Sequence, residues 1–191
     1  AGKIRLADIG IPAAYVDAVE SDTLLLTDET VRQVLPARRP SAHKGTFGHV
    51  GIIAGSVGKT GAAALAAQAA LRMGAGLVTV ATPSSVNDVL EAKLLEVMTF
   101  PLPETTARTL ARSSLERILP FIRERTAVAI GPGLSTHPET VELVRSLLEH
   151  LDRPSVLDAD ALNAIAGRPS LLTDCKTPPV LTPHPGEMAR L

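Results

Sequence analysis

Residues His49–Ala81 read HVGIIAGSVGKTGAAALAAQAALRMGAGLVTVA and carry the clearest structural pattern in the chain. An apolar run at 50–54 is followed by a helix-like segment at 61–73 that stops at Gly74, and a second apolar run lies at 77–81. Short unbroken apolar strands separated by helices are typical of a parallel sheet, because crossover connections cover both of its faces with helices. The stretch therefore predicts an α/β architecture.

The same alternation continues toward the end of the chain. Further strands are predicted at 96–100, 127–130, 155–157 and 180–181. Further helices are predicted at 86–94, 108–123, 139–151 and 161–166. Ser85 and Asp88 have the spacing of a capping box for the first of these helices. We expect a mostly parallel sheet with helices on both faces.

The segment before His49 is less regular. It contains a strand-like run at 4–9, closed by Gly10-Ile11-Pro12, and an amphipathic segment at 28–35 behind a possible Thr27 cap. Residues 37–44, which include two arginines, a serine and a proline, have the composition of a linker. This part is expected to be an appended piece rather than a second core.

Composition excludes several classes of function. The 191 residues are 45% hydrophobic and 20% charged, with a mean hydropathy of +0.20, as in a globular chain of one domain with an appended piece. Nineteen Lys and Arg against 20 Asp and Glu create no field that would attract nucleic acid or acidic lipid. With no Trp, one Tyr and three Phe, the chain also lacks a surface for stacking bases.

Cysteine content and hydropathy predict a cytoplasmic protein that does not enter a membrane. The single Cys175 cannot form an internal disulfide, which favours a reducing compartment. The longest apolar stretch, 61–71, is interrupted by Gln68 and is well short of a membrane span. The first residues lack both a signal-peptide core and an initiator Met, so we expect this chain to be part of a longer polypeptide.

Special residues follow the predicted strands at their carboxyl ends. These are Gly55-Ser56, Thr82-Pro83, Gly131-Pro132-Gly133, Asp158-Ala159-Asp160 and Thr182-Pro183-His184. The carboxyl ends of parallel strands lie along one edge of a sheet, where open α/β folds bind ligands. The sequence therefore predicts that these five turns line one crevice.

The first of these turns contains Gly58-Lys59-Thr60, which ends a nucleoside-triphosphate loop in other proteins. The full motif requires glycine at position 53, which is Ile53. The spacing instead indicates a Gly-rich strand-to-helix turn. The backbone N–H groups of such a turn can still bind an anion. Most alanines of the following helix are explained by close packing, and Ala62, in its first turn, is the candidate for ligand contact.

The turn after the predicted strand at 127–130 contains Gly131 and Gly133. Glycines there allow a ligand's sugar or phosphate to approach the backbone. A tight turn without a ligand explains them almost as well.

Asp158, Asp160 and Asn163 place two carboxylates and an amide at a strand end and helix start. They could hold Mg²⁺ through water or orient a hydroxyl group. Capping of the helix by Asp158 or Asp160 is an equally good interpretation.

His184 and Glu187 lie on a turn that is stiffened by prolines, so their side chains are candidates for a site. Glu187 could instead be a first-turn helix charge.

Six motifs occur in a fixed order. They are KGTFGH (44–49), GS (55–56) followed by GAA (61–63), RMGAGLV (72–78), IGPGL (130–134), DADALN (158–163) and LTPHPGE (181–187). Together they resemble the ADP/ATP-dependent NAD(P)H-hydrate dehydratases, the carboxyl-terminal domain of the YjeF family, which has a ribokinase-like fold. The resemblance covers 44–191, and the partial length of the match implies a partial ribokinase-like domain.

The opening residues resemble the last strand of the NAD(P)H-hydrate epimerase domain that precedes the dehydratase in bifunctional members. This resemblance implies that residues 1–26 are the tail of an epimerase domain and that 27–191 begin the dehydratase domain. The parent would then be a bifunctional metabolite-repair enzyme.

The resemblance implies a lyase that removes water from NADHX or NADPHX, using ADP or ATP with Mg²⁺. By position, Ala62, Gly133 and His184 would contact the hydrated dinucleotide. The polar side of the crevice would be lined by Asp158, Asp160, Asn163 and Glu187. Gly131 is a further secondary candidate, and no metal ligand is assigned.

Two departures from the family pattern concern the loop at Lys59 and the end of the chain. Relatives often have an aromatic residue in that loop, so its ligand contacts are expected to differ. Relatives also continue to a nucleotide segment and to a Gly-Ser-Gly-Asp motif with the catalytic Asp, which would lie beyond Leu191. The chain alone is therefore expected to be inactive.

Two other functions fit the same residues. The fold could belong to a kinase of a sugar or vitamin alcohol, or the chain could be a non-catalytic binding fragment with an exposed sheet edge. The resemblance also implies a homo-oligomer.

Overall fold

The computed structural model describes residues 2–3, 5–21, 23, 25–35, 37–173 and 175–191. The chain divides into two compact units, Ala1–Ser41 and Ala42–Leu191. The larger unit contains the sheet and all of the predicted site residues.

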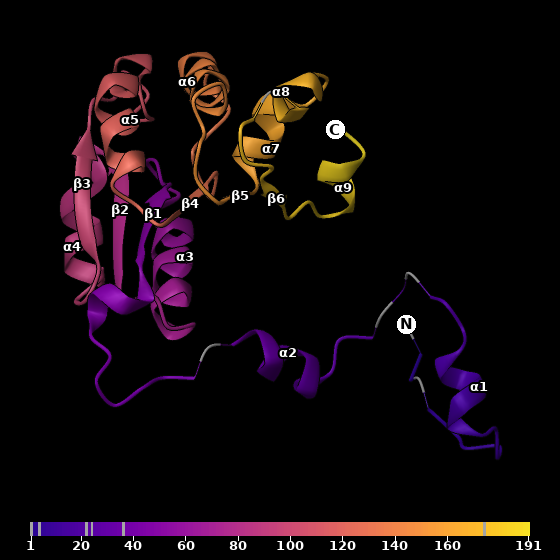
Figure 1. The fold of residues 1–191 in the computed structure, drawn as a ribbon. Coiled ribbons are helices and arrows are strands. Elements are labelled where there is room, and N and C mark those ends of the chain that lie inside the picture. The colour runs from indigo at the N-terminus through magenta and orange to yellow at the C-terminus, as the bar shows by residue number, and fades with distance from the viewer. Residues whose placement is uncertain (1, 4, 22, 24, 36, 174) are drawn as a thin grey trace. The chain divides into compact units, whose positions relative to one another are not determined.

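Six strands form one sheet in the described part of the chain, in the order β3-β2-β1-β4-β5-β6 (Figure 1). Their bounds are β1 His49–Ile53, β2 Leu77–Pro83, β3 Met98–Leu102, β4 Ala127–Ile130, β5 Ser155–Leu157 and β6 Val180–Leu181. Every neighbouring pair is parallel, which confirms the predicted α/β class.

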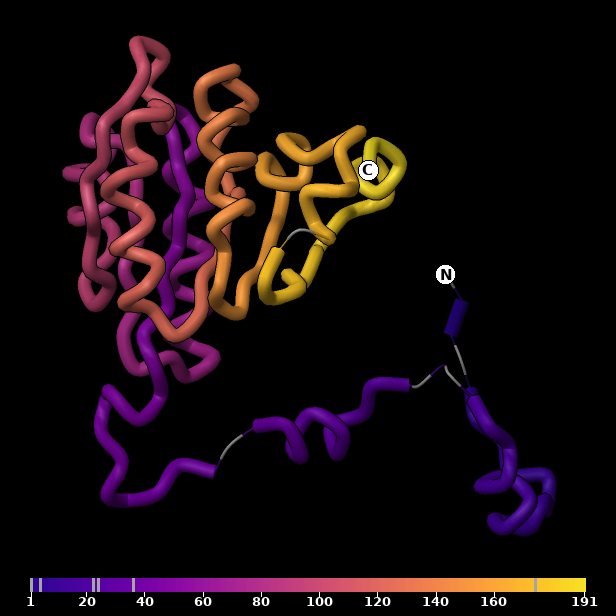
Figure 2. Tube along the Cα trace, turned by 45° about the horizontal axis from the view of Figure 1, so that its top comes forward, coloured from indigo at the N-terminus to yellow at the C-terminus, as the bar shows by residue number. Residues whose placement is uncertain are grey.

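Helices connect the strands and cover both faces of the sheet. Their bounds are α3 Thr60–Arg72, α4 Asn87–Lys93, α5 Leu115–Arg123, α6 Pro138–Leu148, α7 Asp160–Ile165, α8 Ser170–Thr173 and α9 Pro185–Met188. Single 3₁₀ turns lie at Lys44–Phe47, Ser84–Val86 and Arg112–Ser114. Figure 2 shows α5 and α6 side by side over the strands.

Two apolar clusters lie on opposite sides of the sheet, because consecutive strand residues point to opposite faces. Ile52 belongs to the cluster that contains Ala63 of α3, whereas Ile53 belongs to the cluster that contains Ile118 of α5 and Leu143 of α6. Ala63 has no exposed surface, and its small side chain lets α3 lie close to the sheet.

The start of α4 differs from the sequence-based expectation. The residue that caps α4 is Val86, and no side chain caps its first turn, so the predicted capping box of Ser85 and Asp88 is wrong. The Ser85 hydroxyl instead accepts a hydrogen bond of 2.9 Å from Arg108 Nε. A competing partner from a neighbouring loop therefore replaces the local cap.

The predicted helix at 108–123 begins later, at Leu115. A turn precedes it, in which Arg108 has a positive φ of 58° and Thr105 bridges to Thr109 through their hydroxyls at 2.9 Å. A left-handed residue cannot continue an α-helix, so helix geometry starts only after this turn.

The smaller unit contains two short helices, α1 Ala13–Asp17 and α2 Asp28–Val34. Thr27 accepts a hydrogen bond from the Thr30 amide, which confirms the predicted cap of α2. The predicted strand at 4–9 is not formed at 5–9, and residue 4 lies outside the described residues. A strand needs a partner strand for its backbone groups, and no strand is formed among the described residues of this unit.

Burial in the smaller unit is low. None of its described residues is buried, and Leu6 and Leu25 are 102% and 81% exposed. Among the described residues of the whole chain, no helix has the length and hydropathy needed to cross a membrane.

His49, at the start of β1, is held by β2. Its Nε2 lies 2.8 Å from the Thr79 hydroxyl. Burial is the main cause that lowers the pKa of His49, the positive charge of Arg125 lowers it further, and Glu124 opposes both effects.

The lowered pKa of His49 predicts a loss of stability in acid. The unfolded chain, in which the histidine pKa is 6.5, binds the proton more readily than the folded chain, so the free energy of unfolding should fall as the pH drops through 6.5. The loss should level off below the folded pKa. His49→Gln removes this titration, so in denaturant unfolding from about pH 8 to about pH 5 the variant should lose less stability than the unmodified chain. Parallel pH curves would contradict the assignment.

Candidate functional site

The order of the strands creates a switch point between β1 and β4. After β1 the chain moves outward through β2 and β3, and it then returns to pair β4 with the other side of β1. The loops that leave β1 and β4 therefore depart in opposite directions, which opens the position where α/β sheets bind ligands.

The two loops at the switch point are joined by hydrogen bonds. The Gly55 amide donates to the Pro132 carbonyl at 2.9 Å, and the buried Ser56 hydroxyl donates to the Gly133 carbonyl at 2.7 Å. The two loops thus form one continuous surface.

Ala62 and Gly133, two of the predicted binding residues, meet at this surface. A Cβ atom added to Gly133 would lie 3.3 Å from Ala62 Cβ and 2.9 Å from both Cβ and the carbonyl oxygen of Lys59. Gly133 has a φ of +69°, so the close contact and the left-handed backbone both require glycine.

Gly131 is required for a tight turn. Its φ is +131°, and an added Cβ would collide with the Asp158 carbonyl and lie 2.9 Å from Ala161 Cβ. The space that the missing side chain leaves is therefore occupied by protein. Of the two interpretations of Gly131, the turn accounts for the observed geometry.

Asp160 joins three segments of the chain. Its Oδ2 accepts from the Ser135 amide at 2.8 Å and from Lys59 Nζ at 3.1 Å. Its Oδ1 accepts from Asn163 Nδ2 at 3.2 Å. The Asp160 side chain is 13% exposed, so these donors replace most of its water.

The helix-capping interpretation of the two aspartates is wrong. The N-cap position of α7 is Ala159, with a φ of +50°, and no side chain caps the helix. Asp158 instead accepts a hydrogen bond of 2.8 Å from the Thr182 hydroxyl, which joins the ends of β5 and β6.

Direct binding of Mg²⁺ does not fit the carboxylate of Asp160. Both oxygens of Asp160 already hold protein donors, one of them the cationic Lys59. Among the described residues, no group of three His, Cys, Asp or Glu side chains is placed to hold a metal ion.

His184 and Glu187 form a capping box on α9. His184 Nδ1 accepts from the amides of Gly186 and Glu187 at 3.0 and 3.4 Å, and the His184 amide donates to Glu187 Oε2 at 3.0 Å. Glu187 is thus a first-turn helix charge, as its alternative interpretation held. Because Nδ1 of His184 accepts these hydrogen bonds, the ring proton is assigned to Nε2. The Nε2 atom lies 3.2 Å from Glu187 Oε1.

A hydrogen bond joins α9 to the rest of the site. Arg190 Nε donates to Asn163 Oδ1 at 3.1 Å, and Asn163 in turn donates to Asp160. The helix that His184 caps is therefore connected through side chains to the loops that carry Ala62 and Gly133.

The sequence assigned no individual role to several residues of this network, although Ser56 and Thr182 lie in the predicted turns. Ser56, Ser135, Thr182 and Arg190 each act through one donor group. Ser135 donates only through its backbone N–H, so its residue type could not have indicated this hydrogen bond. The sequence indicates Lys59 only as part of an incomplete phosphate loop.

The family model for NAD(P)H-hydrate dehydratase matches residues 50–191. The chain belongs to the NAD(P)H-hydrate dehydratase family. The bifunctional NAD(P)H-hydrate repair enzyme Nnr of Moorella thermoacetica is 50% identical over 190 residues, which are 100% of this chain and 36% of that protein. The corresponding enzyme of Escherichia coli is 35% identical, and the match covers 100% of this chain and 34% of that protein. The chain thus spans about a third of the length of these relatives.

Solved structures agree with this family. The ADP/ATP-dependent NAD(P)H-hydrate dehydratase of Bacillus subtilis, co-crystallized with ATP/Mg²⁺, is 34% identical with a TM-score of 0.66, and the match covers 86% of this chain and 54% of that one. A ribokinase-like superfamily protein of Enterococcus faecalis has a TM-score of 0.71 at 23% identity, and the match covers 87% of this chain and 55% of that one. The second likeness supports the ribokinase-like fold alone.

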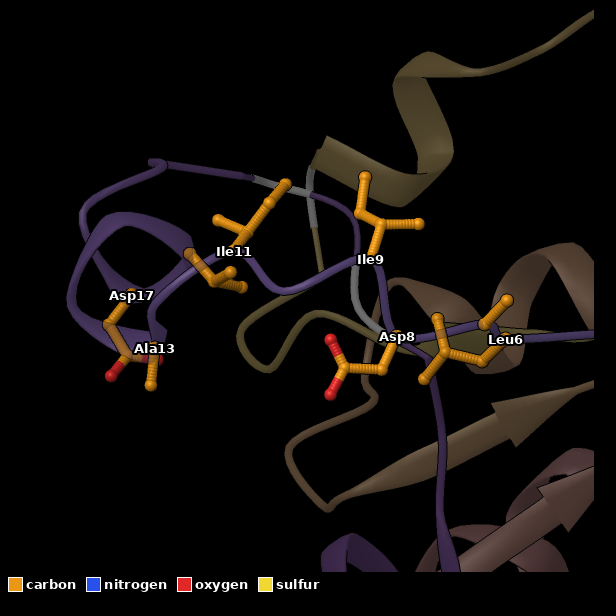
Figure 3. Close-up of a pocket in the computed structure, with 8 residues that line it drawn as sticks. Leu6, Asp8, Ile9, Ile11, Ala13 and Asp17 are labelled. Atoms are coloured by element: carbon orange, nitrogen blue, oxygen red, sulfur yellow. The ribbon is translucent and has the colours of Figure 1, made fainter.

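A hollow of about 700 Å³ lies within the smaller unit, outside the part matched to the dehydratase family. Figure 3 shows its lining, in which the apolar side chains of Leu6, Ile9 and Ile11 accompany Asp8 and Asp17. None of the predicted site residues contributes to it.

Gly131 provides a test of the geometry of the switch point. Gly131→Ala should lower the free energy of unfolding by more than about 3 kcal/mol, because it combines a strained backbone with a collision at the Asp158 carbonyl. Gly58 is a matched control, because its φ is +77° but an added Cβ would meet nothing within 4 Å. Gly58→Ala should cost only about 1 kcal/mol for the left-handed backbone. Equal losses in denaturant unfolding would contradict this account.

Proposed function

We propose that this chain takes part in the ADP- or ATP-dependent dehydration of NAD(P)H hydrate, as a lyase that returns NADHX or NADPHX to NADH or NADPH. The observation that carries the proposal is the contact between Ala62 and Gly133 at the switch point, in a chain of the NAD(P)H-hydrate dehydratase family. The similar protein of Bacillus subtilis is an ADP/ATP-dependent NAD(P)H-hydrate dehydratase, and that of Moorella thermoacetica is a bifunctional NAD(P)H-hydrate repair enzyme.

The chemistry explains why a nucleotide is consumed. Hydroxide is a poor leaving group, and phosphorylation of the ring hydroxyl converts it into a phosphate that leaves readily. Loss of that phosphate and of a proton from the neighbouring ring carbon restores the double bond. The overall reaction of NADHX with ATP then gives NADH, ADP and inorganic phosphate.

The residues of this chain would bind and orient the dinucleotide. Ala62, which is partly exposed, would contact the dinucleotide with its side chain, and Gly133, which is buried beside Lys59, would contact it through its backbone. The His184 imidazole, which is held in the capped turn with its Nε2 3.2 Å from Glu187 Oε1, would contact the dinucleotide. Because the Asp160 oxygens are engaged, Mg²⁺ is expected to arrive bound to the nucleotide phosphates.

The remaining polar candidates would act by holding the binding residues in place. Asp158 fixes Thr182 beside His184, while Asn163 connects Asp160 with Arg190. The backbone turn at Gly131 would determine the conformation of the loop that contains Gly133.

We also propose the domain division 1–26 and 27–191, with the first segment as the tail of an NAD(P)H-hydrate epimerase domain. The matched relatives are bifunctional enzymes, and Leu6 and Ile9 are the kind of exposed apolar residues that a neighbouring domain would cover.

The buried Cys175 favours a reducing compartment, and we place the reaction in the cytoplasm. Exposed Leu65 and Met73, both at 71%, support a homo-oligomer.

The dehydration is tested on the polypeptide that the complete reading frame encodes. Incubation with NADHX, Mg²⁺ and either ADP or ATP should restore the absorbance of NADH and release phosphate in equal amounts. The same mixture without nucleotide is the control. Absence of recovery from a folded protein would contradict the proposal, and phosphate retained on a stable product would favour the small-molecule kinase.

A further inference from the structure

Lys59 lies between the two loops of the switch point but has no role in the function proposed above. Its Nζ is 3.1 Å from Asp160 Oδ2, and its side chain is 48% exposed. Its Cβ and carbonyl oxygen lie where a side chain at Gly133 would stand, and the Ala62 amide donates to the Lys59 carbonyl at 3.2 Å. A positive charge therefore stands beside both proposed substrate contacts.

The Asp160 carboxylate does not depend on Lys59 alone. The Ser135 amide and the Asn163 side chain also donate to it, and Arg190 polarises Asn163. An ammonium group has three N–H donors, and only the one directed at Asp160 has a protein acceptor in the described part of the chain. Lys59 can therefore bind a further acceptor without leaving Asp160 unsatisfied.

The glycines on either side of Lys59 in the sequence have open space next to their backbone. A Cβ atom added at either Gly58 or Gly61 would find no atom within 4 Å. The backbone around the lysine is thus open, in contrast to Gly133, where an added Cβ would collide with Lys59.

We propose that Lys59 is a specificity-determining residue that binds a phosphate group of the hydrated dinucleotide. Asp160 holds the ammonium at the edge of the site before the ligand arrives. A partly exposed ion pair contributes little stability, so a phosphate can share or displace Asp160 at low cost. This assignment rests on the proposed function and adds the ligand group that this loop recognises.

The test compares Lys59→Met with Lys59→Arg and with Lys93→Met in the polypeptide that the complete reading frame encodes. Lys93, in the last turn of α4, is an exposed control outside the site. Lys59→Met should raise the KM for the dinucleotide roughly tenfold or more and leave kcat nearly unchanged. Lys59→Arg should restore most of the affinity, and Lys93→Met should change neither constant.

The two sources of phosphate are distinguished by the substrate. An equal rise in KM for NADHX and NADPHX would assign Lys59 to the pyrophosphate, whereas a rise for NADPHX alone would assign it to the 2′-phosphate. An unchanged KM for both, or a rise confined to the KM for ADP or ATP, would overturn the proposal.

A binding measurement separates this inference from the proposed function. Calorimetric titration with NADPH needs no turnover, and Lys59→Met should weaken its binding by a similar factor. The double variant Lys59→Met/Asp160→Asn should bind NADPH as weakly as Lys59→Met. Unaltered binding of NADPH by the folded Lys59→Met variant would refute the role of Lys59, whatever the outcome of the dehydration assay.

Discussion

The carboxylate of Asp160 holds three separate segments of the chain at the carboxyl edge of the sheet. It receives hydrogen bonds from the loop after β4 through Ser135, from the start of α3 through Lys59 and from α7 through Asn163. A nearly buried carboxylate is stable only when such donors replace its water. The relative positions of these loops therefore depend on satisfying one charged group.

The parallel sheet makes this arrangement possible. Its topology brings together residues about 100 positions apart, as in the pair of Lys59 and Asp160. The alanine face of α3 lets the helix start close beside the loop after β4, so that Ala62 and Gly133 touch. The small side chains of α3 thus allow both the close packing of the core and the close approach of the loops at the site.

Much of the fold could be predicted from the sequence, because hydrophobic periodicity records burial. The strands at 127–130, 155–157 and 180–181 occur as predicted, and α3 and α6 lie within a few residues of their expected bounds. The errors occur where distant partners decide the local structure. Ser85 bonds Arg108 rather than capping α4, and the backbone reversal at Arg108 delays α5.

The candidate site was predictable in location but not in its internal contacts. Turn residues after each strand indicated a common edge, and the motifs indicated a dinucleotide. Whether Asp160 would cap its own helix or bind another loop could not be decided from spacing, because both choices use the same residue type. The role of His184 as a cap likewise depends on backbone geometry that the prolines permit but do not specify.

The contact between Asp160 and Ser135 has a consequence for natural variation. Position 135 contributes only its backbone amide and has a φ of +82°, so its side chain is free to drift among homologues as long as the backbone reversal survives. Glycine and asparagine suit that conformation, whereas proline would remove both the donor and the permitted angle. Residues at this position should therefore be selected for their backbone conformation and not for their side-chain chemistry, a pattern that a search for invariant side chains would overlook.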